Sequence, residues 1–489
     1  MRTTTSSLRF SLPQFLLWIA AAMLIGSLAV INPYQNAPQN LALGSVLAVI
    51  ALLPLSAWMA PGGERRIPLL AMHGLFYVVA YALGGFVKLP ISLRGLAVAE
   101  SDTTRALLAA LCSWLMILAG YALGRRCRTV WALDLLSIDS PAMSRVVAVL
   151  LYPISVVVLV WARRSEQPEW QQVPEMVHMF LLLWVLHAAW SRQLAPTLRR
   201  AITLVAIPVE FVLFGLLAEG FLAGLLFYGL AFGITYAETR RRVPLALPIV
   251  VVVIFTVITP AKAEYRSTTW KTTGPRIGQL EGTMTFVQIA WDNLAKGSFG
   301  ANRIDTIELV HARLVQLHTV AAVMADTPGI QPYRYGATLL PVLTKFIPRA
   351  IWPDKPREDL GNRWAHDYGY LDREDDATSY NLCWLAEMYM NGGWVGVALL
   401  SATVGLLMGW LWRWLLVTRS GSAHYAFAFM MAYGFFYPES NMSGGVGNLI
   451  PSAMMGLTII AAMRPFSGQR AGALRRRSHA RGSMALAAE

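Results

Sequence analysis

Residues 394–416 read WVGVALLSATVGLLMGWLWRWLL, an apolar run that carries a single charge, Arg413. A helix needs about 20 apolar residues to cross about 30 Å of hydrocarbon, so this run predicts a membrane span. The whole chain has a matching composition, since 56% of its 489 residues are hydrophobic and only 14% are charged. Soluble domains carry about 25% charged residues. The sequence therefore predicts an all-α polytopic membrane protein.

Similar apolar stretches recur along the chain and predict about twelve spans. They lie at 13–31, 41–60, 67–87, 106–124, 144–162, 173–190, 201–217, 220–237, 243–261, 394–416, 422–437 and 448–463. One helix over 201–237 would overshoot the bilayer, and Glu219-Gly220 can form the turn that divides it. We expect four parts: a membrane domain of about nine helices at 1–261, a loop domain at 262–393, about three more helices at 394–463, and a basic tail at 464–489.

Basic residues set the expected orientation, because cytoplasmic loops are enriched in Lys and Arg. Arginines precede the first span and then follow every second one, at 65–66, 125–128, 192–200, 240–242 and 419, and more lie in the tail. Lys88, Arg94, Arg105 and Arg163-Arg164 break this pattern. We therefore expect a bacterial inner-membrane protein with both termini in the cytoplasm and 262–393 in the periplasm.

The distribution of charge agrees with this orientation. The 262–393 segment holds 14 Lys/Arg and 15 Asp/Glu, so its net charge is −1, and the chain's net +13 lies outside it. Most of that excess faces the cytoplasm, where it can anchor the topology and meet anionic membrane lipid. A nucleic-acid partner is not needed to explain the basic balance.

The periplasmic loop is expected to be partly helical. Residues 262–300 are mixed and rich in turns, and the spacing of apolar residues then predicts a helix from Arg303 to Met324 that packs on the membrane domain or lies at its surface. A shorter helix is predicted from Gly336 to Phe346, ended by Pro348. The phrase IPRAIWPDKP at 347–356 follows, and its three prolines make a stiff path.

Charges are segregated on either side of that phrase. Residues 326–357 hold five cations and two carboxylates, whereas residues 358–376 hold seven carboxylates and two cations. One interpretation is a solvated loop with local ion pairs, each worth about 0–1 kcal/mol. The other is a rigid cationic cluster that holds a lipid-borne phosphate, since Arg bonds two phosphate oxygens at once and Lys adds a point charge.

The second interpretation gives a set of candidate site residues. The diphosphate-binding candidates are Arg266, Arg334, Tyr335, Lys345, Arg349, Lys355 and Arg357, with Trp352 expected at the headgroup level. Cations of this kind can stabilise the charge that grows on a diphosphate leaving group without a metal ion. The hydroxyl that attacks the sugar then needs only a carboxylate or a histidine to take its proton.

Carboxylates in apolar surroundings are the candidates for that base. Glu387 lies in the otherwise apolar segment Leu382–Met390, about seven residues before the helix expected from Trp394, where packing or capping is the alternative role. Glu210 lies within a predicted span, and intramembrane carboxylates are functional candidates by default. Asp354 is a third candidate. Glu439 and Asn441 in YPESNMSGG, at the outer end of a helix, could contact the substrate or form a plain turn.

Three phrases in and beside the loop carry a resemblance to a known family. IPRAIWPDKP, PYRYGATLLPVL at 332–343 and LAEMYMNGGWVGV at 385–397 resemble the oligosaccharide repeat-unit polymerases, the Wzy-type O-antigen and exopolysaccharide polymerases. The resemblance covers about 80 residues, together with the general plan of many helices and one large late loop. An arginine-x10-glycine pattern of some members is absent, because position 360 is Leu and the glycine is Gly361.

The resemblance implies a GT-C-like glycosyltransferase without cofactor or metal. Such an enzyme moves a glycan chain from one undecaprenyl-diphosphate carrier onto another lipid-linked repeat unit at the periplasmic face. Carried over by position, the implied site holds Arg334, Tyr335, Arg349, Trp352, Lys355 and Glu387. A chain-length regulator and a flippase are possible partners.

Two other functions fit parts of the sequence. A ligase of the O-antigen type would use the same donor and the same cations with a different acceptor, which the sequence does not distinguish. A transporter with twelve helices would usually place its long loop centrally and in the cytoplasm, whereas here the loop follows the ninth predicted span and is expected to face outward. The polymerase is the function that the sequence favours.

Overall fold

The computed structural model describes most of the chain, namely residues 11–31, 36–60, 66–86, 99–127, 138, 140–162, 168–210, 222–244, 246, 261, 264–265, 279–295, 314–347, 352, 354–355, 358–372, 374–375, 378–416 and 421–466. Within these residues the chain forms helices and no strand, so the predicted all-α class is confirmed.

The helices before the long loop alternate with short connections. They are α1 (Leu12–Ile31), α2 (Pro38–Met59), α3 (Leu69–Ala80), η1 (Ala82–Gly85), α4 (Glu100–Gly124), α5 (Pro141–Val146), η3 (Val147–Leu151), α6 (Tyr152–Ala162), α7 (Pro168–Trp190), α8 (Pro196–Ala201), η4 (Ile202–Ala206), α9 (Ile207–Glu210) and α10 (Leu222–Arg240). The segments η3 and η4 are π-helical turns that continue into their neighbours.

The loop and the C-terminal part add further helices. They are α12 (Gln279–Ala295), α14 (Leu317–Asp326), η6 (Ala337–Leu339), α15 (Leu340–Thr344), α16 (Leu360–Asp367), α17 (Trp384–Leu411), η7 (Trp412–Leu416), α18 (Ser422–Tyr433), η8 (Val446–Asn448), α19 (Leu449–Met463) and η9 (Arg464–Phe466).

Among the described residues, six helical segments are long and apolar enough to cross a membrane, and they indicate a membrane protein. They are Pro38–Met59, Glu100–Gly124, Pro141–Ala162, Gln172–Trp190, Trp384–Leu416 and Val446–Phe466. Most of the other predicted spans coincide with helices that are shorter within the described residues, such as α3 at 67–87. The predicted span at 243–261 lies almost wholly outside the described residues, so twelve spans stay a prediction.

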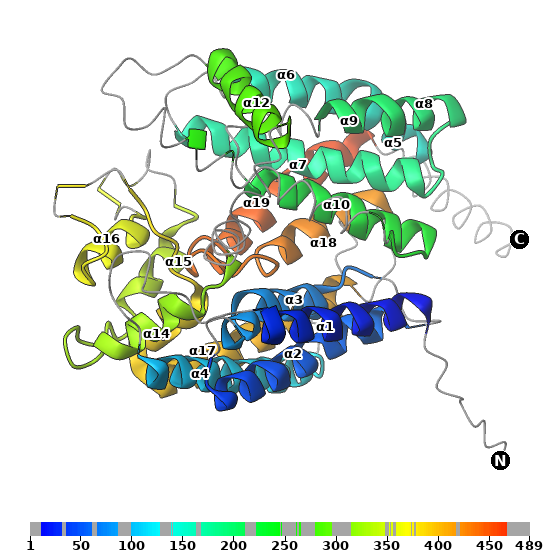
Figure 1. Ribbon diagram of the computed structural model, residues 1–489. Coiled ribbons are helices and arrows are strands. Elements are labelled where there is room, and N and C mark those ends of the chain that lie inside the picture. The colour runs from blue at the N-terminus through cyan, green and yellow to red at the C-terminus, as the bar shows by residue number, and fades with distance from the viewer. Residues whose placement is uncertain are drawn as a thin grey trace, which may run out of the picture.

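The helices form two groups that Figure 1 shows one above the other. In the lower group α2 packs on α3 and α4, and α4 packs along α17. In the upper group α7 packs on α6, α10, α18 and α19. The two groups touch through α3 and the end of α18, where His73 Nδ1 lies 2.7 Å from the carbonyl oxygen of Phe435.

Glycines allow α4 and α17 to approach until their backbones touch. Gly120 and Gly124 are four residues apart on α4, and Gly405 and Gly409 are four residues apart on α17. A Cβ atom on Gly120 would lie 2.1 Å from the carbonyl oxygen of Ala402, and one on Gly405 would lie 2.2 Å from that of Ile117. Small residues with this spacing are typical of close helix packing in membranes. The pair α4–α17 therefore depends on positions that only glycine can occupy.

The loop elements α14, α15 and α16 lie together at one end of the helices, opposite the end at which α1 begins (Figure 1). α14 packs on α4 and α17, and α15 packs on η8. The predicted short helix over 336–346 is confirmed as η6 and α15. Of the helix predicted from Arg303 to Met324, the structure describes the second half, where α14 packs on the membrane helices as expected.

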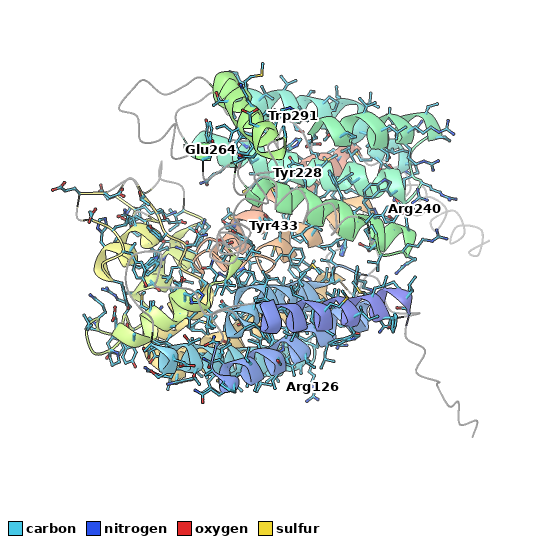
Figure 2. All side chains as sticks on the ribbon, viewed as in Figure 1. Arg126, Tyr228, Arg240, Glu264, Trp291 and Tyr433 are labelled. Atoms are coloured by element: carbon cyan, nitrogen blue, oxygen red, sulfur yellow. The ribbon has the colours of Figure 1, made fainter. Side chains whose placement is uncertain are left out.

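One expectation for the loop was wrong. Residues 262–300 were expected to be mixed and rich in turns, but they contain the 17-residue helix α12, in which Met284, Val287 and Trp291 are exposed apolar residues. Figure 2 shows Trp291 on this helix. The helix expected from Trp394 is confirmed as the long segment of α17 that follows a break at Gly392 and Gly393, and a short helical segment from Trp384 precedes it. Glu387 lies in the first turn of this short segment, seven residues before Trp394.

Candidate functional site

Glu387 is the centre of a buried polar cluster at the start of α17. Its side chain is fully buried, and one carboxylate oxygen accepts a hydrogen bond of 2.8 Å from Thr338 Oγ1. The other oxygen accepts one of 2.6 Å from the backbone N–H of Met442. A buried carboxylate is tolerated when donors satisfy it in this way. Glu387 therefore joins three segments that are far apart in the sequence: η6, α17 and the loop at 438–447.

Asn391, one helical turn after Glu387, completes the cluster. Its amide nitrogen donates to Thr338 Oγ1 at 2.7 Å and to the carbonyl oxygen of Glu387 at 2.8 Å. Its amide oxygen accepts from the backbone N–H of Gly336 at 2.8 Å. The chain at 334–336 is thus attached to the helix, and it reverses there through two left-handed residues, Tyr335 (φ 46°) and Gly336 (φ 89°).

The helix breaks directly after this cluster. Gly393 has a left-handed φ of 58°, and a Cβ atom there would lie 2.7 Å from the hydroxyl of Tyr333. Any other residue would therefore meet both backbone strain and a clash. The break separates a short first segment, which carries Glu387 and Asn391, from the long apolar segment that follows.

The predicted cations that the structure describes already have protein partners. Arg334 forms an ion pair of 2.6 Å with Asp367 on α16, and Lys345 forms one of 2.9 Å with Glu358. The ammonium of Lys355 donates to the carbonyl oxygens of Lys345 and Ile347, at the end of α15. The expected local ion pairs between the basic and the acidic block are therefore present at Arg334 and Lys345. Both pairs are partly exposed, so each is weak enough for an incoming anion to exchange.

Lys345 and Glu387 hold adjacent residues of one loop. The ammonium of Lys345 donates at 3.2 Å to the carbonyl oxygen of Ser443, and Glu387 accepts from the N–H of Met442. A cation and a carboxylate thus both bind the backbone of the same two residues, Met442 and Ser443. Predicted site residues that are 42 positions apart in the sequence are brought together there.

Glu439 and Asn441 lie in that same loop. Glu439 is buried and accepts a hydrogen bond from Asn381 Nδ2, and the carbonyl oxygen of Pro438 accepts one from the N–H of Trp384. The side-chain oxygen of Asn441 accepts from the N–H of Gly444 at 3.0 Å, which is the plain-turn alternative for this residue. Gly445 is needed at its position because a Cβ atom would lie 2.2 Å from the indole of Trp384.

The remaining predicted residues of the loop are less informative. Arg266, Arg349 and Arg357 lie outside the described residues. Trp352 is half-buried, Asp354 is exposed in a turn, and Tyr335 is 84% exposed beside the cluster. Tyr368 at the end of α16 shares a hydrogen bond with Thr327 Oγ1, and burial raises the pKa of Tyr368. This contact fixes α16 against the chain that follows α14.

Glu210 is not part of this cluster. It lies in the upper helix group, buried with Tyr152 and His178, whose hydroxyl and ring nitrogen contact its two oxygens. The other ring nitrogen of His178 lies 2.9 Å from Ser155 Oγ. Glu210 was predicted as a catalytic candidate for the same reaction as Glu387, and the structure puts it among different elements, α6, α7 and α9.

Sequence reasoning missed Thr338 and Asn391, which hold Glu387 in place. Asn391 follows Glu387 by four residues, and that helical spacing could have indicated it. Thr338 had no such signal, because its contact with Glu387 spans 49 residues. Among the described residues, no group of three or more His, Cys, Asp or Glu lies close enough to hold a metal ion.

A family model described as a domain of unknown function (DUF8712) matches residues 101–414, more than half of the chain. The matched stretch contains α4, α7, α14 and α17, and therefore Lys345, Glu387 and Asn391, but it ends before the loop at 438–447. Neither a curated protein nor a solved structure matches the chain.

Proposed function

The chain belongs to the family of the domain of unknown function DUF8712, and we propose that it is a membrane glycosyltransferase that polymerises polysaccharide repeat units. The donor is a glycan on an undecaprenyl-diphosphate carrier, and the acceptor is a hydroxyl of another lipid-linked repeat unit. The reaction takes place on the periplasmic side of the inner membrane, where the long loop is expected to lie.

The proposal is supported by one observation above the others: Lys345 and Glu387 hold adjacent residues, Ser443 and Met442. In the transfer, the acceptor oxygen bonds to the anomeric carbon as the bond from that carbon to the diphosphate oxygen breaks. The diphosphate leaves with the bonding electrons, and cations stabilise its growing charge. The acceptor proton passes to a carboxylate. A cation and a carboxylate that bind adjacent residues of one loop match these two needs.

The partners of the cations are consistent with ligand exchange. Lys345 is paired with Glu358 and Arg334 with Asp367, and each of these carboxylates lies at the surface. A diphosphate carries more negative charge than one carboxylate. We therefore expect it to displace Asp367 from Arg334 or Glu358 from Lys345 at little cost in ion-pair energy. Glu387 is different, because it is fully buried and must be reached by local opening of η6 or of the loop at 438–447.

The test is a reconstitution of the purified protein with a synthetic lipid-diphosphate oligosaccharide, followed by gel separation of the products. A ladder of lengthened chains is expected. Lys345→Gln should reduce the ladder by about tenfold or more, since it removes one cation from the leaving group. Arg363→Gln is the matched control. Arg363 on α16 also forms an ion pair with a partly exposed carboxylate, that of Asp359 at 2.6 Å, but it does not contact the loop at 438–447 in the described structure. Equal losses in both variants would contradict the role of Lys345.

The products also decide between neighbouring functions. Absence of any transfer by the wild-type protein would contradict the proposal, and a single transfer product would favour the ligase. A transporter is the second candidate, favoured by the buried contact between Glu210 and His178, because paired ionisable groups inside helices are typical of proton-coupled carriers. If the wild-type protein moved the lipid-linked oligosaccharide across the membrane of reconstituted vesicles, and Glu210→Gln lost this movement, the transporter would be favoured.

A further inference from the structure

Five arginines converge on one cavity at the other end of the molecule. The cavity has a volume of about 610 Å³ and is lined by Arg192, Arg199, Arg200, Arg240 and Arg242. Arg192 lies in the connection between α7 and α8, and Arg199 and Arg200 lie in the last turn of α8. Arg240 is the last residue of α10, and Arg242 follows that helix. Figure 2 places Arg240 at the end of α10 that points away from α14, α15 and α16. We call this cavity the arginine pocket.

The guanidinium groups of the arginine pocket are not used by the fold. Within the part of the chain that the structure describes, none of the five makes an ion pair or a side-chain hydrogen bond. Other arginines of the chain are used: Arg125 lies over the ring of Trp412 at 4.1 Å, and Arg413 donates to the carbonyl oxygen of Arg125. Five like charges around one cavity create a positive potential there, which favours the binding of an anion.

Backbone strain supports a ligand role for the pocket. Arg192 has a φ of 66°, in the left-handed region that is unfavourable for any residue with a Cβ atom. Helices often end in this conformation with a glycine, which adopts it freely. Here the position after α7 carries an arginine on the pocket's rim. Strained residues of this kind gather at binding sites, where the strain positions a side chain.

The pocket also has an apolar wall. Trp190 and Tyr236 pack edge to face, with ring centroids 5.8 Å apart, and both line the cavity. Leu204 on η4 lines it too and is 71% exposed, and its neighbour Val205 is 60% exposed. Exposed apolar side chains on a helix of a membrane protein face acyl chains. The arginine pocket is therefore lined by both cationic and apolar side chains, and Leu204 is exposed beside it.

We infer that the arginine pocket binds the headgroup of an anionic phospholipid, with the acyl chains along Leu204 and Val205. The phosphate oxygens match the planar fork of arginine, which can bond two of them at once. Basic pockets between helices at the cytoplasmic face are a common form of anionic lipid site. A soluble phosphate would use the same cations but would have no use for the apolar wall.

Topology alone does not require this arrangement. The positive-inside rule depends on how many Lys and Arg lie in the short loops, and not on whether they share a cavity. A variant that keeps every arginine but alters the pocket therefore distinguishes the two roles. If the arginines only set the topology, lipid binding stays unchanged, and if they form a lipid site, lipid binding falls. The lipid inference also does not depend on the proposed transfer reaction, because the pocket and Glu387 lie in different helix groups.

The test is lipid binding to the purified full-length protein, measured by native mass spectrometry with phosphatidylglycerol and with phosphatidylcholine. We expect phosphatidylglycerol to be retained at least about tenfold better. The double variant Arg199→Gln/Arg240→Gln should lose about 10–30-fold in that binding. The double variant Arg126→Gln/Arg413→Gln is the matched control, since it removes two exposed arginines from the other helix group, and it should change binding by less than about twofold.

A second variant keeps every arginine in place. Thr203 also lines the pocket, and Thr203→Glu introduces a carboxylate that competes with the lipid phosphate for the guanidinium groups. It should lose phosphatidylglycerol as the double variant does. Wild-type retention in Thr203→Glu, equal losses in the control pair, or equal retention of both lipids would overturn the inference. Displacement of the lipid by millimolar inorganic phosphate alone would assign the pocket to a soluble anion and would overturn it as well.

Discussion

Glu387 has two roles that a single substitution can separate. Its carboxylate joins Thr338 and the N–H of Met442, and it is the proposed acceptor of a proton. Glutamine has almost the same shape, so its oxygen can accept from Met442 while its amide donates to Thr338. Alanine removes the acceptor of the Met442 N–H and of the Thr338 hydroxyl, while Thr338 Oγ1 still accepts from Asn391. A buried donor without an acceptor costs about 1–3 kcal/mol.

We therefore predict that Glu387→Gln keeps the thermal unfolding temperature within a few degrees and stops polymer formation. Glu387→Ala should lower that temperature clearly and also stop the reaction. Both quantities are measured on purified protein, by a thermal scan and by the ladder on a gel. Full activity in Glu387→Gln would leave the carboxylate with a purely structural role.

At this scale the sequence identified single residues better than their partners. Glu387 and Glu210 stand out because each is a carboxylate in an apolar stretch, and both are buried. Their partners come from other helices, so no local pattern reveals them. The cations were predicted for a phosphate, but composition could not show that Arg334 and Lys345 also meet carboxylates of the acidic block.

Among the elements, α4 and α17 pack most closely. Four glycines place their backbones in contact, and Tyr77, Ser113 and Ser401 add a chain of hydroxyl hydrogen bonds across α3, α4 and α17, each 2.6 Å long. In lipid, where there is no hydrophobic effect to drive helices together, such contacts account for much of the association. The lower helix group is therefore sensitive to volume at these glycines.

Gly405→Ala should destabilise the protein by about 1–3 kcal/mol, because the new methyl group would lie 2.2 Å from the carbonyl oxygen of Ile117 and the helices must move apart. Gly26→Ala on α1 is the matched control. A Cβ atom there has no neighbour within 4 Å, so it should leave stability unchanged or slightly increased. Both effects are read as shifts of the thermal unfolding temperature. Similar shifts in the two variants would contradict the close contact of α4 and α17.

Apolar periodicity predicted most helices but not all of them. The helix expected from Trp394 is present, but the short segment from Trp384 to Asn391 that precedes it across the break at Gly392 and Gly393 was not predicted. α12 was missed because the residues around it are rich in turn formers, although Met284, Val287 and Trp291 share a face. Glycine marks ends and kinks alike, and only tertiary contacts such as that of Tyr333 with Gly393 distinguish them.

For the whole molecule, the two ends differ in chemistry. α14, α15 and α16 lie at one end, and the arginine pocket at the other (Figures 1 and 2). From the positive-inside rule we expect the arginine end to face the cytoplasm. The number of spans could not be fixed from hydropathy alone, because several predicted spans, such as that at 67–87, correspond within the described residues to helices too short to be counted as crossing a membrane.

This orientation can be tested by cysteine labelling in spheroplasts. Cys127 follows α4, at the end that carries Arg125 and Arg126, and Asp354 is exposed in the loop. We predict that Asp354→Cys, in a background lacking the three native cysteines, reacts with a membrane-impermeant maleimide. Cys127 as the sole cysteine should react only after permeabilisation. The opposite pattern would place the loop inside the cell and remove the basis of the proposed reaction.

The close pairing of α4 with α17 has a mechanical consequence. At one end of the pair Arg105 of α4 donates to the hydroxyl of Tyr389 on α17, and at the other end Arg125 lies on Trp412. In backbone contact between these two points, α4 and the part of α17 after Gly393 behave as a single stiff unit. A tilt of this unit at its Arg125 end would reach Glu387 through the contact of Arg105 with Tyr389, because Tyr389 and Glu387 lie together on the short segment before the break.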